Sequence, residues 1–294
     1  MTNQITNPKL KSLVILNVMK DLCRVPQLDF DLMLATAIGN SKEFVYTHPE
    51  YPISIIQYLR LRWFLYLYKK HYSVASITKH KEFYGLDFFV NKNVLIPRPD
   101  TELMVAEATR IMNYELGIKD TIYIDVGTGS GCVPIAILKN LLEPITAYAI
   151  DISQPALKVA GKNAKKHDVK INFLHGNLLG PIFHNSKFII HNSNVVITAN
   201  LPYLTEKQFQ DEPSIQREPK SALVADKNGL ALYEELFKQI KNVGLTATIL
   251  TEIDPAQTEA ISQLIKQNLP KSKIEIKKDL GGRDRLVIVN MLSC

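Results

Sequence analysis

The sequence predicts an α/β fold, in which a doubly wound sheet of seven strands ends in an antiparallel hairpin and a small helical domain precedes it. Three observations lead to this prediction. Apolar residues in the first 75 positions recur at helical spacing. From Tyr123 onward short apolar runs alternate with helical segments, which is typical of parallel βαβ units. The last two runs are joined only by Gly-Gly-Arg-Asp at 281–284, which favours a terminal hairpin.

Residues 1–75 form the predicted helical domain. Its helical spacing is carried by Leu13, Leu16 and Met19, by Leu32, Ala35 and Ile38 before Gly39, and by residues 58–65. Residues 76–100 place apolar positions among turn residues and are predicted to form a linker β-hairpin. Residues 101–294 form the α/β domain; Pro99 suits the first turn of its leading helix, with Asp100 or Thr101 as the cap.

The seven strands of the α/β domain are predicted from the apolar runs. They fall at 122–125, 147–150, 172–174, 195–198, 247–250, 273–277 and 286–290. The Asn-rich segment 180–194 is predicted to be a long loop.

Composition favours a packed, intracellular protein. Hydrophobic residues make up 46% and charged residues 22%, so a core is expected. The net charge of +6 suits an anionic partner such as RNA, the ribosome or an acidic protein, and equally an ordinary solubilising surface. Three distant cysteines match no disulfide or metal spacing, so we expect a reducing cytoplasm and no metal. No signal peptide, membrane span or heptad pattern is visible, so a cytoplasmic monomer is expected.

A glycine-rich loop follows the first strand of the α/β domain. It reads Asp-Val-Gly-Thr-Gly-Ser-Gly from Asp125 to Gly131, and its glycines let the backbone lie close to a ligand. The spacing G-x-G-x-G is neither the dinucleotide fingerprint nor a P-loop, and the preceding acid suits a cofactor without phosphates. Asp151 ends the second strand, where a carboxylate can accept hydrogen bonds from ribose hydroxyls. The combination resembles the class I methyltransferases, which use S-adenosyl-L-methionine.

A second motif, Asn-Leu-Pro-Tyr, follows the fourth strand. Ligands of open α/β sheets bind beyond the carboxyl ends of the strands, so Asn200 is expected beside the cofactor. Its side chain and the backbone carbonyl near Leu201 could accept the two N–H groups of an amide or of an exocyclic base amine. Tyr203 could stack on either planar group. The motif therefore predicts methyl transfer to such a nitrogen, aided mainly by positioning.

Three segments resemble the HemK/PrmC family of protein-(glutamine) methyltransferases. They are Leu-Ile-Pro-Arg-Pro-Asp-Thr-Glu at 95–102, the glycine loop followed by Asp151, and Gly-Arg-Asp-Arg at 282–285. Weaker similarity at 29–39 and 46–50 extends the match over nearly the whole chain.

The resemblance implies the activity and the site. The helical domain would help to dock a peptide-chain release factor, and the methyl group would go to the glutamine of its Gly-Gly-Gln motif. The implied acceptor site is Asn200, Leu201, Pro202 and Tyr203. The predicted cofactor contacts are Asp125, Gly127, Thr128, Gly129, Ser130, Gly131, Asp151, Asn177, Leu178 and Asn200.

The chain departs from the family pattern at three places. Leu201 stands where the acceptor motif usually has proline, which keeps the backbone carbonyl and loses rigidity. Asn177 replaces an acid that would face the adenine amine. In the linker, Ser73, Ser76 and Lys79 replace the usual Pro, Tyr and Gly.

Two other interpretations stay open at this point. Asn-Leu-Pro-Tyr is also the acceptor motif of ribosomal RNA adenine dimethyltransferases, so an adenine amine of RNA or DNA is the first alternative acceptor. A non-catalytic module that binds S-adenosylmethionine is the second.

Overall fold

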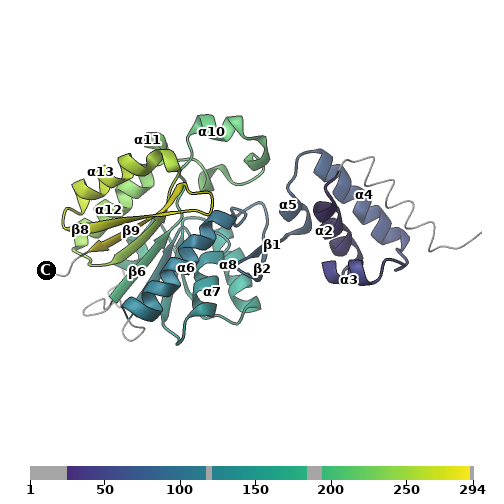
Figure 1. The fold of residues 1–294 in the computed structure, drawn as a ribbon, viewed down its shortest axis with the longest axis horizontal. Helices are drawn as coiled ribbons and strands as arrows, with labels where there is room; N and C mark the ends of the chain where they lie inside the picture. Colours follow the sequence, from purple (N-terminus) through teal and green to yellow (C-terminus); the bar gives the residue numbers. More distant parts are fainter. Residues whose placement is uncertain (1–24, 117–120, 184–193, 292–294) are drawn as a thin grey trace, which may run out of the picture. The chain divides into compact units, whose positions relative to one another are not determined.

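The computed structural model describes residues 25–116, 121–183 and 194–291. The chain divides into two compact units, Met1–Lys79 and His80–Cys294 (Figure 1). The helical prediction at Leu13, Leu16 and Met19 lies outside the described residues. Among the described helices, none combines the length and hydrophobicity needed to cross a lipid bilayer.

The N-terminal unit is helical as far as it is described. Its helices are α2 Gln27–Ile38, α3 Lys42–Thr47, α4 Ile55–Lys69 and α5 Val74–Thr78. Ser41, Ser54 and Ser73 begin the last three helices, and each side chain accepts a backbone N–H of the first turn. Gly39 ends α2 in the left-handed conformation, which confirms the predicted stop. Helix α5 extends beyond residue 75, the predicted end of the helical domain. It begins after its cap Ser73 and ends at Thr78.

A two-stranded hairpin opens the second unit. Strands β1 His80–Phe83 and β2 Leu86–Phe89 pair antiparallel. Tyr84 and Gly85 form the turn with φ of 50° and 71°, as a two-residue hairpin turn requires. Phe83 and Phe88 are fully buried in the core of this unit, so the hairpin packs as part of the α/β domain.

The leading helix begins differently from the prediction. Pro99–Thr101 form a 3-10 turn (η1) and continue into α6 Glu102–Arg110 and the π-helical turn η2 Ile111–Glu115. The predicted capping by Asp100 or Thr101 is wrong, since neither helix start has a side-chain cap. Asp100 instead pairs with Arg285, and the Thr101 hydroxyl accepts a hydrogen bond from Asn200. Both side chains therefore bind residues that are distant in the sequence and do not cap the helix.

The central sheet has seven strands in the order β5-β4-β3-β6-β7-β9-β8. They are β3 Thr121–Val126, β4 Thr146–Asp151, β5 Asn172–His175, β6 Asn194–Ala199, β7 Thr248–Glu252, β8 Ser272–Lys278 and β9 Asp284–Met291. The first five are parallel and the β8–β9 pair is antiparallel. All seven predicted strands and the terminal hairpin are therefore confirmed.

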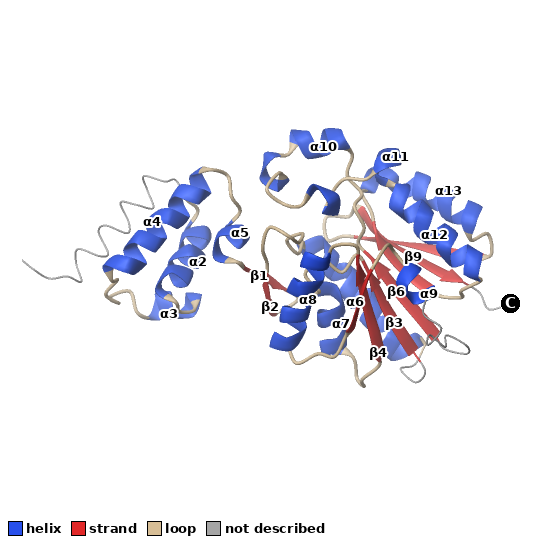
Figure 2. Cartoon of the chain, turned by 180° about the vertical axis from the view of Figure 1, so that it is seen from behind, coloured by secondary structure: helices blue, strands red, loops and turns tan. Residues whose placement is uncertain are grey.

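Helices cover both faces of this sheet (Figure 2). One face packs against α6, α7 Cys132–Asn140 and α8 Gln154–Lys166. The other packs against α9 Gly180–Phe183, α12 Ala231–Val243 and α13 Thr258–Asn268. The predicted loop 180–194 is wrong at its start, because residues 180–183 form α9 with Ile182 buried in the core; residues 184–193 lie outside the described part.

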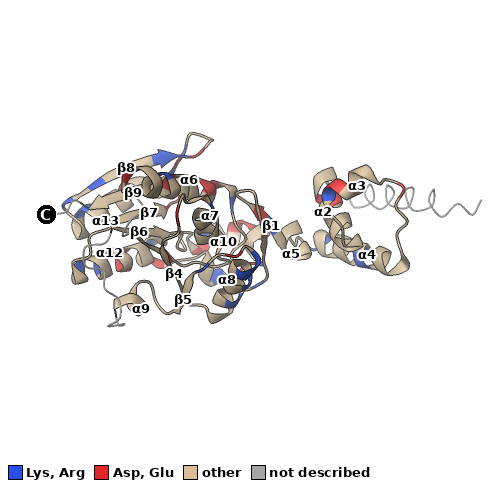
Figure 3. Ribbon diagram, turned by 90° about the horizontal axis from the view of Figure 1, so that it is seen from below, with Lys and Arg blue, Asp and Glu red and all other residues tan. Residues whose placement is uncertain are grey.

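The connection from β6 to β7 carries several short helices ahead of α12. They are α10 Glu206–Asp211, η3 Pro213–Ile215, η4 Lys220–Ala222 and α11 Asp226–Gly229, and η5 Pro255–Gln257 follows β7. Lysines lie on α8 and on β8 (Figure 3). The last two residues of β8 are Lys277 and Lys278.

Candidate active site

The register of the sheet brings three strand ends together. Asp125 of β3 pairs with Thr198 of β6, and Ala199 of β6 pairs with Thr251 of β7. The residues that follow these strands therefore leave the sheet side by side. Strand β3 is also the point where the strand order reverses, since β4 lies on one side of it and β6 on the other. Open α/β sheets bind their ligands at such a switch point.

The glycine loop after β3 needs its glycines. Gly127, Gly129 and Gly131 have φ of 75°, 54° and 78°, which side chains rarely adopt. A Cβ on Gly131 would lie 3.1 Å from the Ala160 Cβ, where α8 packs against the loop. A Cβ on Gly127 would lie 3.1 Å from the Leu201 side chain. The loop thus stays narrow and presents backbone to the space above it.

Asp151 ties the end of β4 to this loop. Its carboxylate accepts a hydrogen bond from the Gly129 N–H at 2.8 Å and another from the Ser153 N–H at 2.8 Å. Burial raises the pKa of the Asp151 carboxyl, and these two backbone N–H groups work against that rise. Each carboxylate oxygen keeps a further lone pair, so the pair of ribose hydroxyls foreseen from the sequence can be accepted here.

Asp125 is held in the sheet by a chain of hydroxyls. The Thr198 hydroxyl donates to the Asp125 carboxylate at 2.6 Å and lies 2.6 Å from the Tyr123 hydroxyl. Asp125 is only 3% exposed, and burial raises its pKa to about 6. Its carboxylate therefore stands at the base of the site as a negative charge at neutral pH.

A pocket opens over the glycine loop, and we name it the glycine-loop pocket. It is lined by Leu95, Pro97, Arg98, Thr101, Asp125, Gly127, Thr128, Gly129, Ser130, Cys132, Val133 and Asn200. Six of the predicted cofactor residues are in this lining, from Asp125 to Ser130 and Asn200.

The remaining predicted cofactor residues lie outside this lining. Gly131 packs against α8, and Asp151 acts on the loop through Gly129. Asn177 donates a hydrogen bond to Glu235 at 2.6 Å. Leu178 is 6% exposed and belongs to the core below α12.

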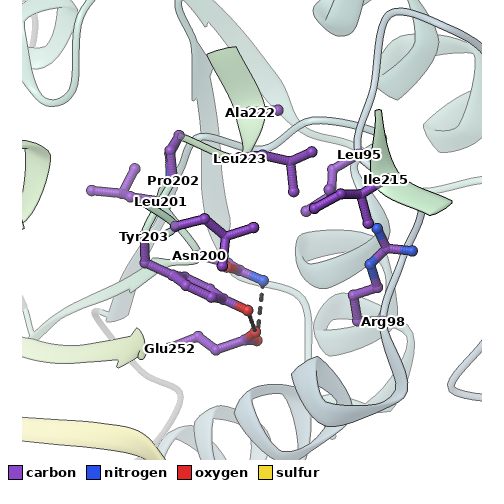
Figure 4. Close-up of a pocket in the computed structure, with 11 residues that line it drawn as sticks. Leu95, Arg98, Asn200, Leu201, Pro202, Tyr203, Ile215, Ala222, Leu223 and Glu252 are labelled. Atoms are coloured by element: carbon purple, nitrogen blue, oxygen red, sulfur yellow. Dashed lines mark hydrogen bonds between the residues drawn. The ribbon is translucent and has the colours of Figure 1, made fainter. Parts of the chain in front are cut away.

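A second pocket, the Tyr203 pocket, lies next to the first. Its lining is Leu95, Arg98, Asn200, Leu201, Pro202, Tyr203, Leu204, Ile215, Ala222, Leu223 and Glu252 (Figure 4). All four residues of the predicted acceptor motif are present. Leu95, Arg98 and Asn200 belong to both pockets, so the two spaces meet at Asn200.

Asn200 and Tyr203 are both bound to a buried carboxylate. The Asn200 Nδ2 donates to the Glu252 Oε2 at 3.0 Å, and the Tyr203 hydroxyl donates to the Glu252 Oε1 at 3.1 Å (Figure 4). The Leu201 N–H donates to the Tyr233 hydroxyl at 3.2 Å. Burial and the charge of Glu252 raise the pKa of Tyr203, so its ring carries a neutral phenol.

Glu252 is a site residue that the sequence did not predict. It ends β7, is 2% exposed and lines the Tyr203 pocket. Its position just beyond the predicted strand 247–250 is the signal that could have identified it, because Asp125, Asp151 and Asn200 also stand at or just after strand ends.

Glu218 was missed as well. Its carboxylate accepts the Ile96 N–H at 2.8 Å and pairs with Arg98 at 2.5 Å, which fixes the segment shared by the two pockets. It comes from the long β6–β7 connection, where no periodic pattern marks it.

Arg285 connects two of the sequence segments that resemble the family, 95–102 and 282–285. From the start of β9 it contacts the Asp100 carboxylate at 3.2 Å and the Ile253 carbonyl at 3.3 Å. The Gly-Arg-Asp-Arg and Pro-Arg-Pro-Asp-Thr-Glu segments are therefore in contact beside Glu252. Burial opposes the charge of Arg285, yet neighbouring acids keep its pKa above the usual value.

The chemistry of the glycine-loop pocket fits S-adenosylmethionine. Its narrow backbone loop admits a flat ligand, and its buried carboxylate suits a cationic amino acid end better than a phosphate. Within the described ranges, no group of three or more His, Cys, Asp or Glu side chains could hold a metal ion.

Comparison with known proteins gives the family of this chain. The profile of the ribosomal protein L11 methyltransferase family matches residues 111–206. A release factor glutamine methyltransferase of Enterococcus faecalis is 36% identical over 220 residues, which is 74% of this chain and 75% of that protein. Another, from Dictyoglomus turgidum, is 32% identical over 267 residues, 89% of this chain and 90% of that protein.

A solved structure shares the fold. The catalytic domain of human METTL16, in complex with MAT2A 3'UTR hairpin 1, is 12% identical with a TM-score of 0.54 and covers 80% of each chain. This likeness shows the class I methyltransferase fold alone. The sequence relatives show more: the chain belongs to the release factor glutamine methyltransferase family, whose members are S-adenosylmethionine-dependent enzymes.

Proposed function

We propose that this protein transfers the methyl group of S-adenosylmethionine to the side-chain amide of the glutamine in the Gly-Gly-Gln motif of peptide-chain release factors. The observation that carries the proposal is the meeting of the two pockets at Asn200. One pocket has the glycine loop of a methyltransferase and the other has the acceptor motif, so a nitrogen bound at Asn200 faces the cofactor space.

The residues of the chain have separate tasks in this reaction. The cofactor, when bound, supplies an electrophilic methyl group on a sulfonium. The glycine loop and Asp151 hold it, and Asp125 offers a negative charge at the base of the pocket. The Asn200 Oδ1 and the Leu201 carbonyl accept the two amide N–H groups, which increases electron density on the attacking nitrogen. Transfer from the bound cofactor would leave its sulfur as an uncharged thioether, and the proton lost by the amide nitrogen would pass to water.

Positioning supplies most of the rate enhancement in this mechanism. An amide nitrogen is a poor nucleophile, so its alignment with the methyl group matters; good alignment can contribute about 7–11 kcal/mol. The neutral Tyr203 ring lines the pocket and can stack on the planar amide. Asn177 and Leu178 are proposed to contact the adenine side of the cofactor, as the family pattern implies.

The N-terminal unit is proposed to help dock the release factor. Helix α4 has a run of exposed apolar and aromatic side chains on its surface. They are Ile55, Ile56, Leu59, Trp63 and Tyr66, each more than half exposed. Side chains of this kind are enriched at protein interfaces. We further propose that the protein acts as a monomer in the cytoplasm, on translation termination.

Labelled S-adenosylmethionine tests the acceptor. The purified protein is incubated with a release factor from the same organism, with the same factor carrying Gln→Ala in Gly-Gly-Gln, and with ribosomal RNA. Label in the wild-type factor alone is the expected result. Label in RNA would move the assignment to an adenine methyltransferase, which the Asn-Leu-Pro-Tyr motif makes the relevant rival. Cofactor binding without any transfer would favour the non-catalytic module.

Asn200→Ala tests the role of the acceptor motif in the same assay. It removes the acceptor of the amide N–H, so transfer should be abolished. Cofactor binding, measured by calorimetry, should remain largely intact because the glycine loop and Asp151 are unchanged. Retained turnover would refute the role of Asn200.

A further inference from the structure

The side-chain amide of Asn200 has both of its N–H groups in use. The Nδ2 donates to the Thr101 Oγ1 at 3.1 Å and to the Glu252 Oε2 at 3.0 Å. An amide nitrogen carries two hydrogens, so no donor remains. In the described part of the chain no hydrogen bond reaches the Asn200 Oδ1. The oxygen is therefore the end of the amide that is left for a ligand, and it lies where the two pockets meet.

Glu252 determines which end of the Asn200 amide faces the pockets. The two ends of an asparagine amide have nearly the same shape, and their partners determine the orientation. A threonine hydroxyl can accept or donate, so Thr101 suits either orientation. An ionised carboxylate only accepts, so it requires the Nδ2 on its side. With the amide reversed, the Asn200 oxygen would face the Glu252 oxygen.

The same carboxylate also holds the ring of the acceptor motif. Its second oxygen accepts the Tyr203 hydroxyl at 3.1 Å. Both oxygens are thus engaged, at a residue that is 2% exposed and fixed at the end of β7. The Glu252 backbone carbonyl in addition accepts the Tyr233 hydroxyl at 2.5 Å. The carboxylate therefore has little freedom to turn toward a substrate.

We infer that Glu252 is a positioning residue of the methyl transfer: its carboxylate fixes Asn200 with the amide oxygen toward the acceptor and fixes the Tyr203 ring beside it. The inference rests on the proposed function for its substrate. It restricts the acceptor class to nitrogens that carry a hydrogen, because the fixed amide presents only an acceptor to the pocket.

The positioning role of Glu252 depends on pH, because its carboxyl can take up a proton. Burial raises the pKa of the Glu252 carboxyl, while hydrogen bonds from Thr101 and Tyr203 and the charge of Arg285 lower it. Asp100 adds a negative charge on the same side. Protonation gives Glu252 an O–H donor that competes with its two donor partners. Activity should therefore fall as the pH falls through the pKa of Glu252, and the orientation of Asn200 should be lost with it.

Glu252→Gln, Glu252→Asp and a matched control outside both pockets test this inference in the full chain. Glu252→Gln keeps the shape and removes the charge, and we expect kcat to fall by about tenfold or more, since hydrogen bonds to charged groups are the stronger ones. The dissociation constant of S-adenosylmethionine should change by less than about twofold, because the glycine-loop pocket is intact. Glu107→Gln, in the pair that Glu107 forms with Arg110 at 2.8 Å, should leave both quantities unchanged.

The pH profile separates positioning from a structural role. Asp125 titrates in every variant, so the comparison between variants is the readout. The part of the activity loss at low pH that comes from protonation of Glu252 should be missing in Glu252→Gln. It should be present in Glu252→Asp, which keeps a carboxylate. Equal profiles in wild type and Glu252→Gln, with kcat per folded molecule unchanged, would overturn the inference.

A second readout does not depend on the substrate. With ¹⁵N-labelled asparagine, the side-chain amide of Asn200 should give two distinct protons that exchange slowly with water and shift as Glu252 titrates. In Glu252→Gln these protons should exchange faster with water, and the shift with pH should be absent. If wild type methylates no release factor, the proposed function fails and this spectrum still tests Glu252. Fast exchange of both protons in wild type would refute the positioning role.

Discussion

At the scale of single residues, Asp125 shows a conflict between function and stability. It is fully enclosed at the end of β3, and burial raises its pKa from 3.8 to about 6. The folded protein therefore binds the Asp125 proton more tightly than the unfolded chain does. Keeping the carboxylate ionised at neutral pH costs about 3 kcal/mol of folding free energy, from about two pKa units at 1.36 kcal/mol each.

Asp125→Asn should make the fold more stable and the cofactor site weaker. The amide keeps an oxygen for the Thr198 hydroxyl without the charge. At pH 7.5 we expect the free energy of unfolding to rise by about 1–3 kcal/mol. The gain should shrink as the pH is lowered from 7.5 to 5, since wild type then becomes neutral. Urea unfolding at these two pH values is the measurement. A gain that does not depend on pH would show that burial of the charge is not its source.

Leu201 marks the place where this chain leaves the family pattern. Its N–H donates to the Tyr233 hydroxyl, a bond that a proline cannot make. Leu201→Pro should raise turnover several-fold by rigidifying the carbonyl that binds the amide. It should also lower the free energy of unfolding by about 1 kcal/mol through the lost hydrogen bond. Single-turnover rates and urea unfolding measure the two effects separately, and a variant that is no faster would contradict the first.

At the scale of elements, the short helix α11 supports the acceptor motif. Lys227, Asn228 and Gly229 all have positive φ, and Gly229 ends the helix against the backbone of Tyr203. The Gln257 side chain donates to the carbonyls of both Tyr203 and Asn228, at 2.9 and 2.7 Å. The position of Tyr203 is thus set by the β6–β7 connection and by η5.

Gly229→Ala should disturb this support. Its Cβ would lie 1.9 Å from the Tyr203 carbonyl oxygen, which the backbone cannot tolerate without moving. We expect a loss of about 3 kcal/mol or more in stability and a large drop in kcat. Gly244→Ala is the matched control, since Gly244 also has positive φ but open space around its Cβ position; only about 1 kcal/mol should be lost there. Similar losses in both variants would show that φ strain alone is responsible.

The elements themselves were largely predictable from the sequence. The seven strands and the terminal hairpin follow from apolar runs and from the absence of a helix after 277. The predictions that were wrong concern a helix cap and a loop whose residues have partners elsewhere in the fold. Asp100 and Thr101 do not cap a helix, because Arg285 and Asn200 bind them, and 180–183 turn into α9 because Ile182 is buried.

At the scale of the whole molecule, the two units have separate cores. The N-terminal cluster includes Phe30, Met33, Leu61 and Phe64, and it has no member in common with the two clusters of the α/β unit. A unit with its own core can fold alone. Each unit should therefore keep its structure when the other is removed.

The fragment His80–Cys294 tests this division and the docking role together. It should fold and bind S-adenosylmethionine with an affinity within about threefold of the full chain, because both pockets lie in it. Its KM for the release factor should rise at least about tenfold if the N-terminal unit docks the substrate. Calorimetry and steady-state kinetics give the two numbers. An unchanged KM would remove the docking role, and lost cofactor binding would contradict an independent fold.

The sequence by itself determined the fold class, the strand series, the glycine loop with Asp125 and Asp151, and the acceptor motif at Asn200. These features are carried by short periodicities and by motifs of a few residues. Only the tertiary structure decided what holds them: Thr101 and Asn200 are 99 residues apart, Asn200 and Glu252 are 52 apart, and Arg98 and Glu218 are 120 apart. Strand register and the folding of the β6–β7 connection bring these pairs together, and neither the register nor that connection's path is written in local spacing.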